Sequence, residues 1–237
     1  MSRKGQNKKT KTISMPKAVN TSRKETAWTV NTKAGPHTKE TSVALGIVLR
    51  NYAGIVSTMR EVKKILKLGE VKVNGVVRDA HQFPIGLFDV VAIAKQKLFF
   101  RMVFDTKGRL VLKAIEMDAK EKLCKVTKKV VLSKGKIQIT TDDARTFVDI
   151  KANVGDSLKV SLPNGKVTGV IEFKEGSMAY ITKGAHCSST AKIVSIVEGT
   201  EKREKLVKME KGKEIFETIA KNIHVVGKDK VEVEALN

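Results

Sequence analysis

One short stretch of the chain defines both ends of a helix and a tight turn after it. Thr58, followed three residues later by Glu61, forms a capping-box pattern, and Gly69 stands where a helix C-terminus takes a left-handed residue. Asn74 and Gly75, flanked by valines, favour a hairpin because a type I′ turn needs positive φ at both central residues. The stretch therefore predicts a short helix that leads into a β-hairpin.

The predicted helix has one apolar side and one basic side. Met59, Val62, Ile65 and Leu66 recur at helical spacing, so that side can pack against a core. The opposite side presents only positive charge, which suits phosphate, although a solvated helix face is the alternative for any run of charges. The basic side consists of Arg60, Lys63, Lys64 and Lys67.

The charge balance favours phosphate over solvent as the partner of this face. The 237 residues include 46 Lys and Arg against 25 Asp and Glu, a net charge of +21. Such an excess indicates a polyanionic partner, with nucleic acid as the leading candidate. Aromatic residues make up only 5% of the chain, and no apolar run approaches the length of about 18 residues that spans a membrane. We therefore expect no membrane partner.

Residues 1–40 are predicted to form a basic extended arm. Ten Lys and Arg against two Glu give this segment a net charge of +8, and its few apolar residues cannot support folding alone. Trp28, the only tryptophan, favours ordering on a partner over a disordered tail, and Gly35-Pro36-His37 marks a turn. The candidate nucleic-acid contacts of the arm are Arg3, Lys4, Lys8, Lys9, Lys11, Lys17, Arg23, Lys24, Trp28, Lys33, His37 and Lys39.

A second helix is expected before the capped one. Thr41 or Ser42 can cap a helix that runs to Tyr52, with a broad apolar face. The two helices and the hairpin together predict a small domain over residues 41–95. Further candidate nucleic-acid contacts in this domain are Arg50 on the first helix and Lys72, Asn74 and Arg78 around the hairpin.

From residue 97 onward the pattern changes to short strands separated by turns. It predicts a β-rich domain over 96–172 and a second β-rich segment over 173–237. One helical turn is expected at 117–122, and residues 200–209 fit a helix as well as a strand. Lys107 and Arg109 flank a turn and complete the candidate contacts. The expected strands are 98–104, 109–115, 129–132, 136–140, 157–162, 167–173, 178–182, 191–197, 205–210, 214–218 and 223–226.

No constellation of residues points to catalysis. Asp142 and Asp143 are adjacent carboxylates, but neighbours on a strand point to opposite faces, and Arg145 follows, so turn capping or pairing with that arginine is expected instead. The two cysteines lack metal-ligand spacing, and no phosphate-binding glycine motif occurs. We therefore expect no catalytic residue, metal, cofactor or small-molecule substrate. The absence of an apolar N-terminal segment predicts an intracellular protein.

An ordered set of motifs extends along the chain. It comprises Trp28, Gly35-Pro36-His37, the basic helix through Lys64, Val73-Asn74-Gly75, Phe83-Pro84, Asp89-Val90-Val91, residues 105–109 and Val225-Val226-Gly227. In this order the motifs resemble the archaeal and eukaryotic small-subunit ribosomal protein four, e-type, and the similarity covers nearly the whole chain.

The resemblance implies an α+β, multi-domain fold. Its parts are the basic N-terminal arm, an RNA-binding module shared with bacterial ribosomal protein four over 41–95, a central β-domain over 96–172, and a C-terminal SH3-like β-barrel of the KOW type over 173–237. Glu175-Gly176 and Thr182-Lys183-Gly184 are similar to the KOW motif. The chain departs from it at Ser188 and Ala191, where the motif usually has glycine.

The resemblance also implies a function. The chain is expected to be a structural constituent of the small ribosomal subunit, cytoplasmic and ribosome-bound, with small-subunit ribosomal RNA and neighbouring ribosomal proteins as its partners. Binding would depend on phosphate contacts and RNA shape. Two alternatives stay open: an RNA-modifying enzyme with an RNA-delivery module, and a free KOW-type factor of translation or transcription.

Overall fold

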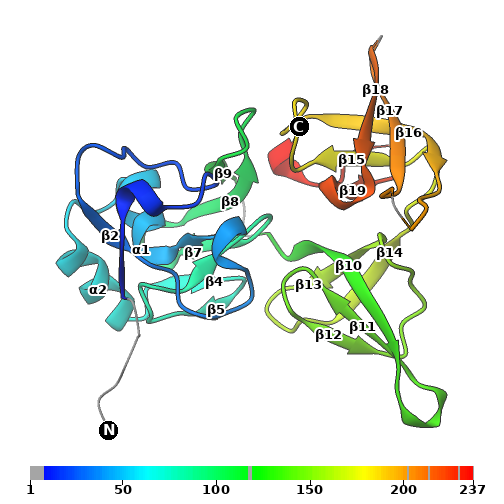
Figure 1. Ribbon diagram of the computed structural model, residues 1–237. Helices are drawn as coiled ribbons and strands as arrows, with labels where there is room; N and C mark the ends of the chain where they lie inside the picture. The colour runs from blue at the N-terminus through cyan, green and yellow to red at the C-terminus, as the bar shows by residue number, and fades with distance from the viewer. Residues whose placement is uncertain (1–7, 117–118, 202, 213, 229, 237) are drawn as a thin grey trace, which may run out of the picture. The chain divides into compact units, whose positions relative to one another are not determined.

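A computed structural model describes residues 8–116, 119–201, 203–212, 214–228 and 230–236 (Figure 1). The fold is mostly β, with a few short helices. The chain divides into two compact units, one formed by 1–103 and 109–118, the other by 104–108 and 119–237. The four segments expected from the sequence are a finer division, and their boundaries stay a prediction.

The first unit is built on a five-stranded sheet with the order β5-β4-β7-β8-β9. The tight turn between its first two strands has Asn74 at φ 53° and Gly75 at φ 77°, which confirms the predicted hairpin. The strands are β4 (Val71–Val73), β5 (Val76–Val77), β7 (Val90–Ile93), β8 (Leu98–Phe104) and β9 (Leu110–Ile115).

The predicted capped helix is confirmed as α2 (Met59–Lys67). The Glu61 N–H donates to Thr58 Oγ1 at 3.3 Å, and the Thr58 N–H donates to Glu61 Oε2 at 3.2 Å. Val62 and Leu66 are buried, and Gly69 adopts the left-handed conformation with φ 71°. Local signals in the sequence are therefore sufficient to define this helix.

The prediction that a helix starts at Thr41 or Ser42 is wrong. Helix α1 begins at Leu45 (Leu45–Ile47) and continues as a π-helical segment (Val48–Tyr52). The residues before it form β3 (Val43–Ala44), which pairs with β6 (Pro84–Ile85). Ser42 Oγ donates to the Thr38 carbonyl at 2.6 Å instead of capping the helix. Pairing with a distant strand has overridden local propensity.

The described part of the arm packs on the first unit and does not extend freely. Strand β1 (Lys9–Lys11) pairs with β2 (Trp28–Val30), and Val19 bridges to Leu110 of β9. The Gln82 side-chain amide donates to two carbonyl groups of the arm. The neighbouring module thus supplies a packing surface that the sequence of the arm itself lacks.

The second unit contains two five-stranded sheets, ordered β12-β11-β10-β13-β14 and β18-β17-β16-β15-β19. The first sheet covers a core that includes Val126, Ile139 and Leu158. The second covers a core that includes Ile193 and Met209. The strands are β10 (Glu121–Val131), β11 (Ile137–Thr141), β12 (Thr146–Val148), β13 (Ser157–Ser161), β14 (Val167–Ile171), β15 (Met178–Ile181), β16 (Thr190–Val197), β17 (Leu206–Lys211), β18 (Glu214–Ile219) and β19 (Ile223–Gly227).

Most strands expected from the sequence are found with small shifts at their ends, but the strand expected at 129–132 is the end of the much longer β10, and β12 was not expected. The helical turn predicted at 117–122 is wrong for residues 121–122, which begin β10, while residues 117–118 lie outside the described residues. Residues 206–211 form strand β17, so the strand interpretation of 200–209 is correct there. The remaining short helical turns are Thr12–Ser14, Lys39–Thr41, Ala94–Gln96, Ser133–Gly135, Ala220–Asn222 and Glu234–Leu236.

Ser188 keeps a glycine-like backbone in the loop before β16. Its φ is 69°, in the left-handed region that glycine adopts most easily, and its N–H donates to the Ile181 carbonyl at 2.9 Å. The turn expected of a glycine is thus formed by a serine. Among the described residues, no helix has the length and apolarity needed to cross a membrane.

Candidate nucleic-acid interface

The basic side of α2 is exposed and uncompensated. Arg60, Lys63, Lys64 and Lys67 are all exposed, and none forms an ion pair with any other described residue. Glu61 is the only acid on the helix, and its carboxylate accepts the cap hydrogen bonds, of which the one from the Thr58 backbone lowers the pKa of Glu61 most. The helix therefore presents four positive charges to solvent.

The arm adds charge beside this helix. Burial lowers the pKa of His81, and the positive charges of Lys63 and Lys8 lower it further. Lys8 of the arm and Lys63 of α2 therefore both add positive charge in the neighbourhood of His81. Gln82 Nε2 donates to the Lys8 carbonyl at 3.1 Å and holds the arm in this position.

A buried carboxylate organises the hairpin beside the basic helix. Asp89 is 0% exposed, and its Oδ2 accepts from the Gly86 N–H at 2.8 Å and lies 2.9 Å from His37 Nε2. Its Oδ1 accepts from Asn74 Nδ2 at 2.7 Å, while Asn74 Oδ1 accepts from the Val90 N–H at 3.0 Å. The hairpin tip, the loop before β7 and the end of the arm are thus joined at one carboxylate.

This arrangement gives His37 and Asn74 a structural role, while their contact with RNA stays a prediction. The His37 side chain is 6% exposed, and both residues place polar atoms in the Asp89 network, so they support the surface from inside. The role of Asp89 was not predicted from the sequence. The available signal was a carboxylate within the otherwise apolar run from Phe88 to Val91, because a buried charge requires partners.

The other predicted RNA contacts differ in their partners, in the unit to which they belong and in their exposure. The Arg78 guanidinium lies 4.5 Å from the centre of the Phe83 ring, and Arg50 Nε donates to Asn51 Oδ1. Lys107 belongs to the second unit, whereas Arg109 belongs to the first. Arg3 and Lys4 lie outside the described residues. Besides Lys8 and the α2 residues, the predicted contacts that are exposed are Lys9, Lys11, Lys17, Arg23, Lys24, Trp28, Lys33, Lys39, Lys72, Lys107 and Arg109.

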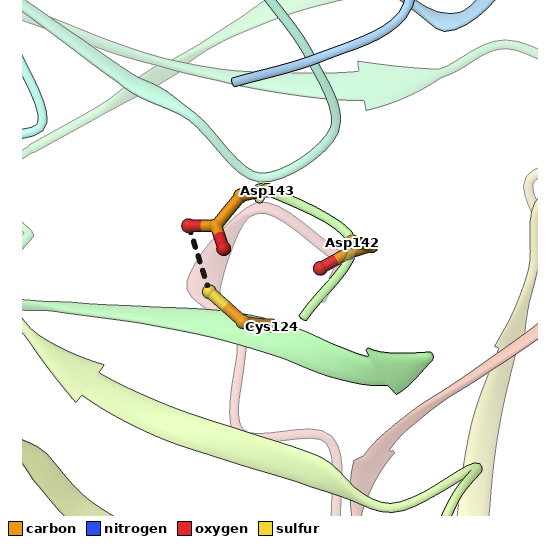
Figure 2. Close-up of side chains that lie close together, drawn as sticks. All are labelled: Cys124, Asp142 and Asp143. Atoms are coloured by element: carbon orange, nitrogen blue, oxygen red, sulfur yellow. Dashed lines mark hydrogen bonds between the residues drawn. The ribbon is translucent and has the colours of Figure 1, made fainter. Parts of the chain in front are cut away.

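The second unit contains a polar cluster of Cys124, Asp142 and Asp143 (Figure 2). One ligand-type atom from each residue lies within 4.8 Å of the other two. Asp143 Oδ2 lies 3.3 Å from Lys122 Nζ and 3.1 Å from Arg145 Nε. The expected pairing of the acidic turn with its arginine is therefore confirmed.

The electrostatics of this cluster favour a buried ion-pair centre. Burial acts to raise the pKa of Asp143, but the charge of Lys122 and the hydrogen bond from Thr141 outweigh it, and the pKa lies below its usual value. Burial also raises the pKa of the Cys124 thiol. Two cations already occupy the surroundings of Asp143. The groups present thus fit a structural centre better than a metal site.

The Lys125 side chain forms a set of hydrogen bonds, the Lys125 clamp, that was not predicted from the sequence. Lys125 Nζ donates to the carbonyl groups of Ala220, Lys221 and Ile223 at 2.8, 3.1 and 2.6 Å. Burial lowers the pKa of Lys125 to about 8. Beside it, Asp142 Oδ2 lies 3.4 Å from His224 Nε2. These contacts hold β10 and the turn after β11 against β19, the edge strand of the second sheet, and against the short helical turn before it.

Similarity to known proteins agrees with this architecture. Residues 96–167 match a family model described as ribosomal family S4e. The small ribosomal subunit protein eS4 of Methanosphaera stadtmanae is 38% identical over 234 residues, which cover 97% of this chain and 96% of the relative. The protein of the same name from Archaeoglobus fulgidus is 36% identical over 221 residues, 92% of each chain.

A solved structure supports the same assignment. The crystal structure of the 30S ribosomal protein S4e from Thermoplasma acidophilum matches with a TM-score of 0.71 and 35% identity, covering 81% of this chain and 98% of that one. The fold, the basic surface and these relatives define the class of the chain as a ribosomal protein. It belongs to ribosomal family S4e.

Proposed function

We propose that this chain is a structural constituent of the small ribosomal subunit, bound to the ribosome in the cytoplasm, where it binds small-subunit ribosomal RNA and neighbouring ribosomal proteins and catalyses no reaction. The observation that carries the proposal is the α2 face, with four exposed cations and no acidic partner among the described residues. Membership of family S4e supports it.

Binding through this surface needs little chemistry beyond charge and position. Lys and Arg side chains neutralise phosphates and release condensed counterions, which makes the affinity depend on salt. The Asp89 network holds the hairpin rigid next to α2, so Lys72 and the helix residues keep a fixed spacing. Phosphate contacts of this kind fix the position of the protein on folded RNA without reading its sequence.

We further propose that residues 173–237 form an SH3-like barrel of the KOW type. The antiparallel five-stranded sheet, the motifs around Gly176 and Gly184, and the left-handed Ser188 support it. This segment contains 12 Lys and Arg against 10 Asp and Glu, so it adds little to the electrostatic attraction. The interface for phosphate therefore belongs mainly to the first unit, and the last segment is better suited to contacts with protein.

Salt dependence of binding tests the proposal. The purified chain should bind small-subunit ribosomal RNA with a logarithmic salt slope of magnitude about 3 or more, given roughly 0.7–0.9 per phosphate contact. An affinity that is nearly flat in salt would overturn the electrostatic account. In gradient sedimentation the chain should stay with small subunits through a moderate salt wash. Release by that wash would favour a free KOW-type factor.

A further inference from the structure

The only tryptophan of the chain is exposed on the arm. Trp28 is 56% exposed, and Ile13, on the turn that follows β1, is 77% exposed. The same segment buries Thr12, Val19 and Thr29, so the exposure of Trp28 is a property of its face of the arm and not of the whole arm. Strands β1 and β2 form a two-stranded ribbon in which Lys11 pairs with Trp28, and Ile13 follows Lys11 by two residues. Figure 1 labels β2 of this ribbon.

The register of the ribbon surrounds the indole with positive charge. Trp28 lies directly opposite Lys11, and Val30 lies opposite Lys9. Since alternate residues of a strand share a face, Lys9 and Lys11 lie on the same face as Trp28, with cross-strand Cβ atoms about 5 Å apart. Thr29, on the other face, is only 5% exposed, so the ribbon turns its lysine and tryptophan face outward.

The ribbon is held firmly at both ends. Near the turn, the Thr12 N–H donates to the Ala27 carbonyl at 3.0 Å, and at the open end the Asn31 N–H donates to the Lys8 carbonyl at 3.2 Å. Gln82 of the first unit donates to the carbonyls of both Lys8 and Asn31. Trp28 is therefore presented by a fixed backbone, so little conformational entropy is lost when a flat ligand stacks on it.

We propose that Trp28 is a stacking platform for an unpaired RNA base, with Lys9 and Lys11 on the phosphates that flank that base. This inference rests on the proposed function and adds a class of target, single-stranded RNA at a loop or bulge. Every base has a π-face that an exposed indole can cover, and the lysines require a polyanion. Bases inside a duplex are stacked on each other and cannot reach the indole.

Intrinsic fluorescence tests the proposal directly, because Trp28 is the only tryptophan. The full chain is titrated with an unstructured single-stranded RNA and, separately, with an RNA duplex of equal length. Single-stranded RNA should quench most of the Trp28 emission, and the duplex should quench it much less. Equal quenching by the two RNAs, or binding without any change in emission, would overturn the stacking role.

Two substitutions separate stacking from charge. Trp28→Leu should weaken binding to single-stranded RNA about tenfold and leave the salt slope unchanged, because no phosphate contact is lost. Trp28→Phe, which keeps an aromatic face, should stay within about threefold of the wild type. Wild-type affinity in Trp28→Leu would refute the platform while leaving the proposed function intact. If the wild type binds no RNA at all, both the proposed function and this inference fail.

Discussion

Asp89 and His37 lie 52 residues apart in the sequence, yet their side chains meet at 2.9 Å, and the carboxylate is completely buried. The same carboxylate accepts from Asn74 and from the Gly86 N–H. It therefore joins the arm, the hairpin tip and the loop before β7. The geometry of the basic surface depends on this one acid, although the acid itself cannot touch RNA.

Removal of the charge at Asp89 should destabilise the first unit. Asp89→Asn replaces an acceptor that serves three donors, and we expect the free energy of unfolding to fall by about 3 kcal/mol, since hydrogen bonds to a buried charge are worth about 1.5–3 kcal/mol each and the amide can retain some of them. Urea unfolding measures the loss. Asp79→Asn, the same change at an exposed position, is the control and should have no measurable effect. Equal stabilities of the two variants would contradict the network.

The packing of His37 against Gly86 gives a second prediction. A Cβ at position 86 would lie 2.5 Å from the His37 ring, so Gly86→Ala should cost about 1–3 kcal/mol through overpacking. His37→Ala removes the obstructing ring. In a double-mutant cycle measured by urea unfolding, Gly86→Ala should therefore cost almost nothing in the His37→Ala background. A cost that is the same in both backgrounds would rule out this close contact.

Charge removal on α2 should change binding without changing stability. Lys63→Gln with Lys64→Gln should reduce the magnitude of the logarithmic salt slope by about two, because each lost phosphate contact removes about one. The free energy of unfolding should stay within about 0.5 kcal/mol of the wild type, as expected for exposed residues.

The matched control for this pair changes two lysines elsewhere. Lys183→Gln with Lys192→Gln removes the same charge at exposed positions of the nearly neutral C-terminal segment. This control should leave the slope close to that of the wild type. If both pairs lower the slope equally, binding depends on total charge and not on the α2 surface.

The ion pair of Asp143 and Lys122 predicts an acid-sensitive second unit. The pKa of Asp143 lies below its unfolded value, so its stabilisation is complete above the unfolded pKa and is lost as the pH falls through the folded pKa. Asp143→Asn should cost about 3 kcal/mol at neutral pH, because it removes the carboxylate from a lysine that is 1% exposed. At a pH below both the folded and the unfolded pKa of Asp143, the stability of the Asp143→Asn variant should approach that of the wild type.

A second substitution identifies the cause of that loss. Lys122→Met in the Asp143→Asn background removes the buried charge and should restore much of the stability at neutral pH. Asp149→Asn, an exposed aspartate of the same unit, should be neutral. Thermal unfolding followed as a function of pH measures both effects. A pH profile of Asp143→Asn that runs parallel to the wild type would show that Asp143 does not supply the acid sensitivity.

Features with local causes could be predicted from the sequence. The capping box of α2 needs only Thr58 and Glu61, and the hairpin turn needs only Asn74 and Gly75, so neighbouring residues define both elements. Strands separated by glycine-containing turns were found for the same reason. The exposure of the α2 charges also followed from helical periodicity alone.

Features that depend on distant partners could not be predicted in this way. Val43 and Ala44 look helical by sequence, but they extend to pair with β6, about 40 residues away. The arm has too little apolar surface to fold alone, and its order depends on contacts such as Gln82 with Lys8. The contact of His37 with Asp89 could not be predicted because the two residues stand at no fixed spacing in the sequence.

The clamp at Lys125 has a consequence for how the polypeptide is made. Its ammonium donates to carbonyl groups 95, 96 and 98 residues further along the chain. During translation, which proceeds from the N-terminus, β10 is synthesised long before these acceptors exist. Lys125 therefore cannot form all three hydrogen bonds until Ile223 has been added. A nascent chain that stops short of Ile223 cannot complete the second unit, however far the first unit has already folded.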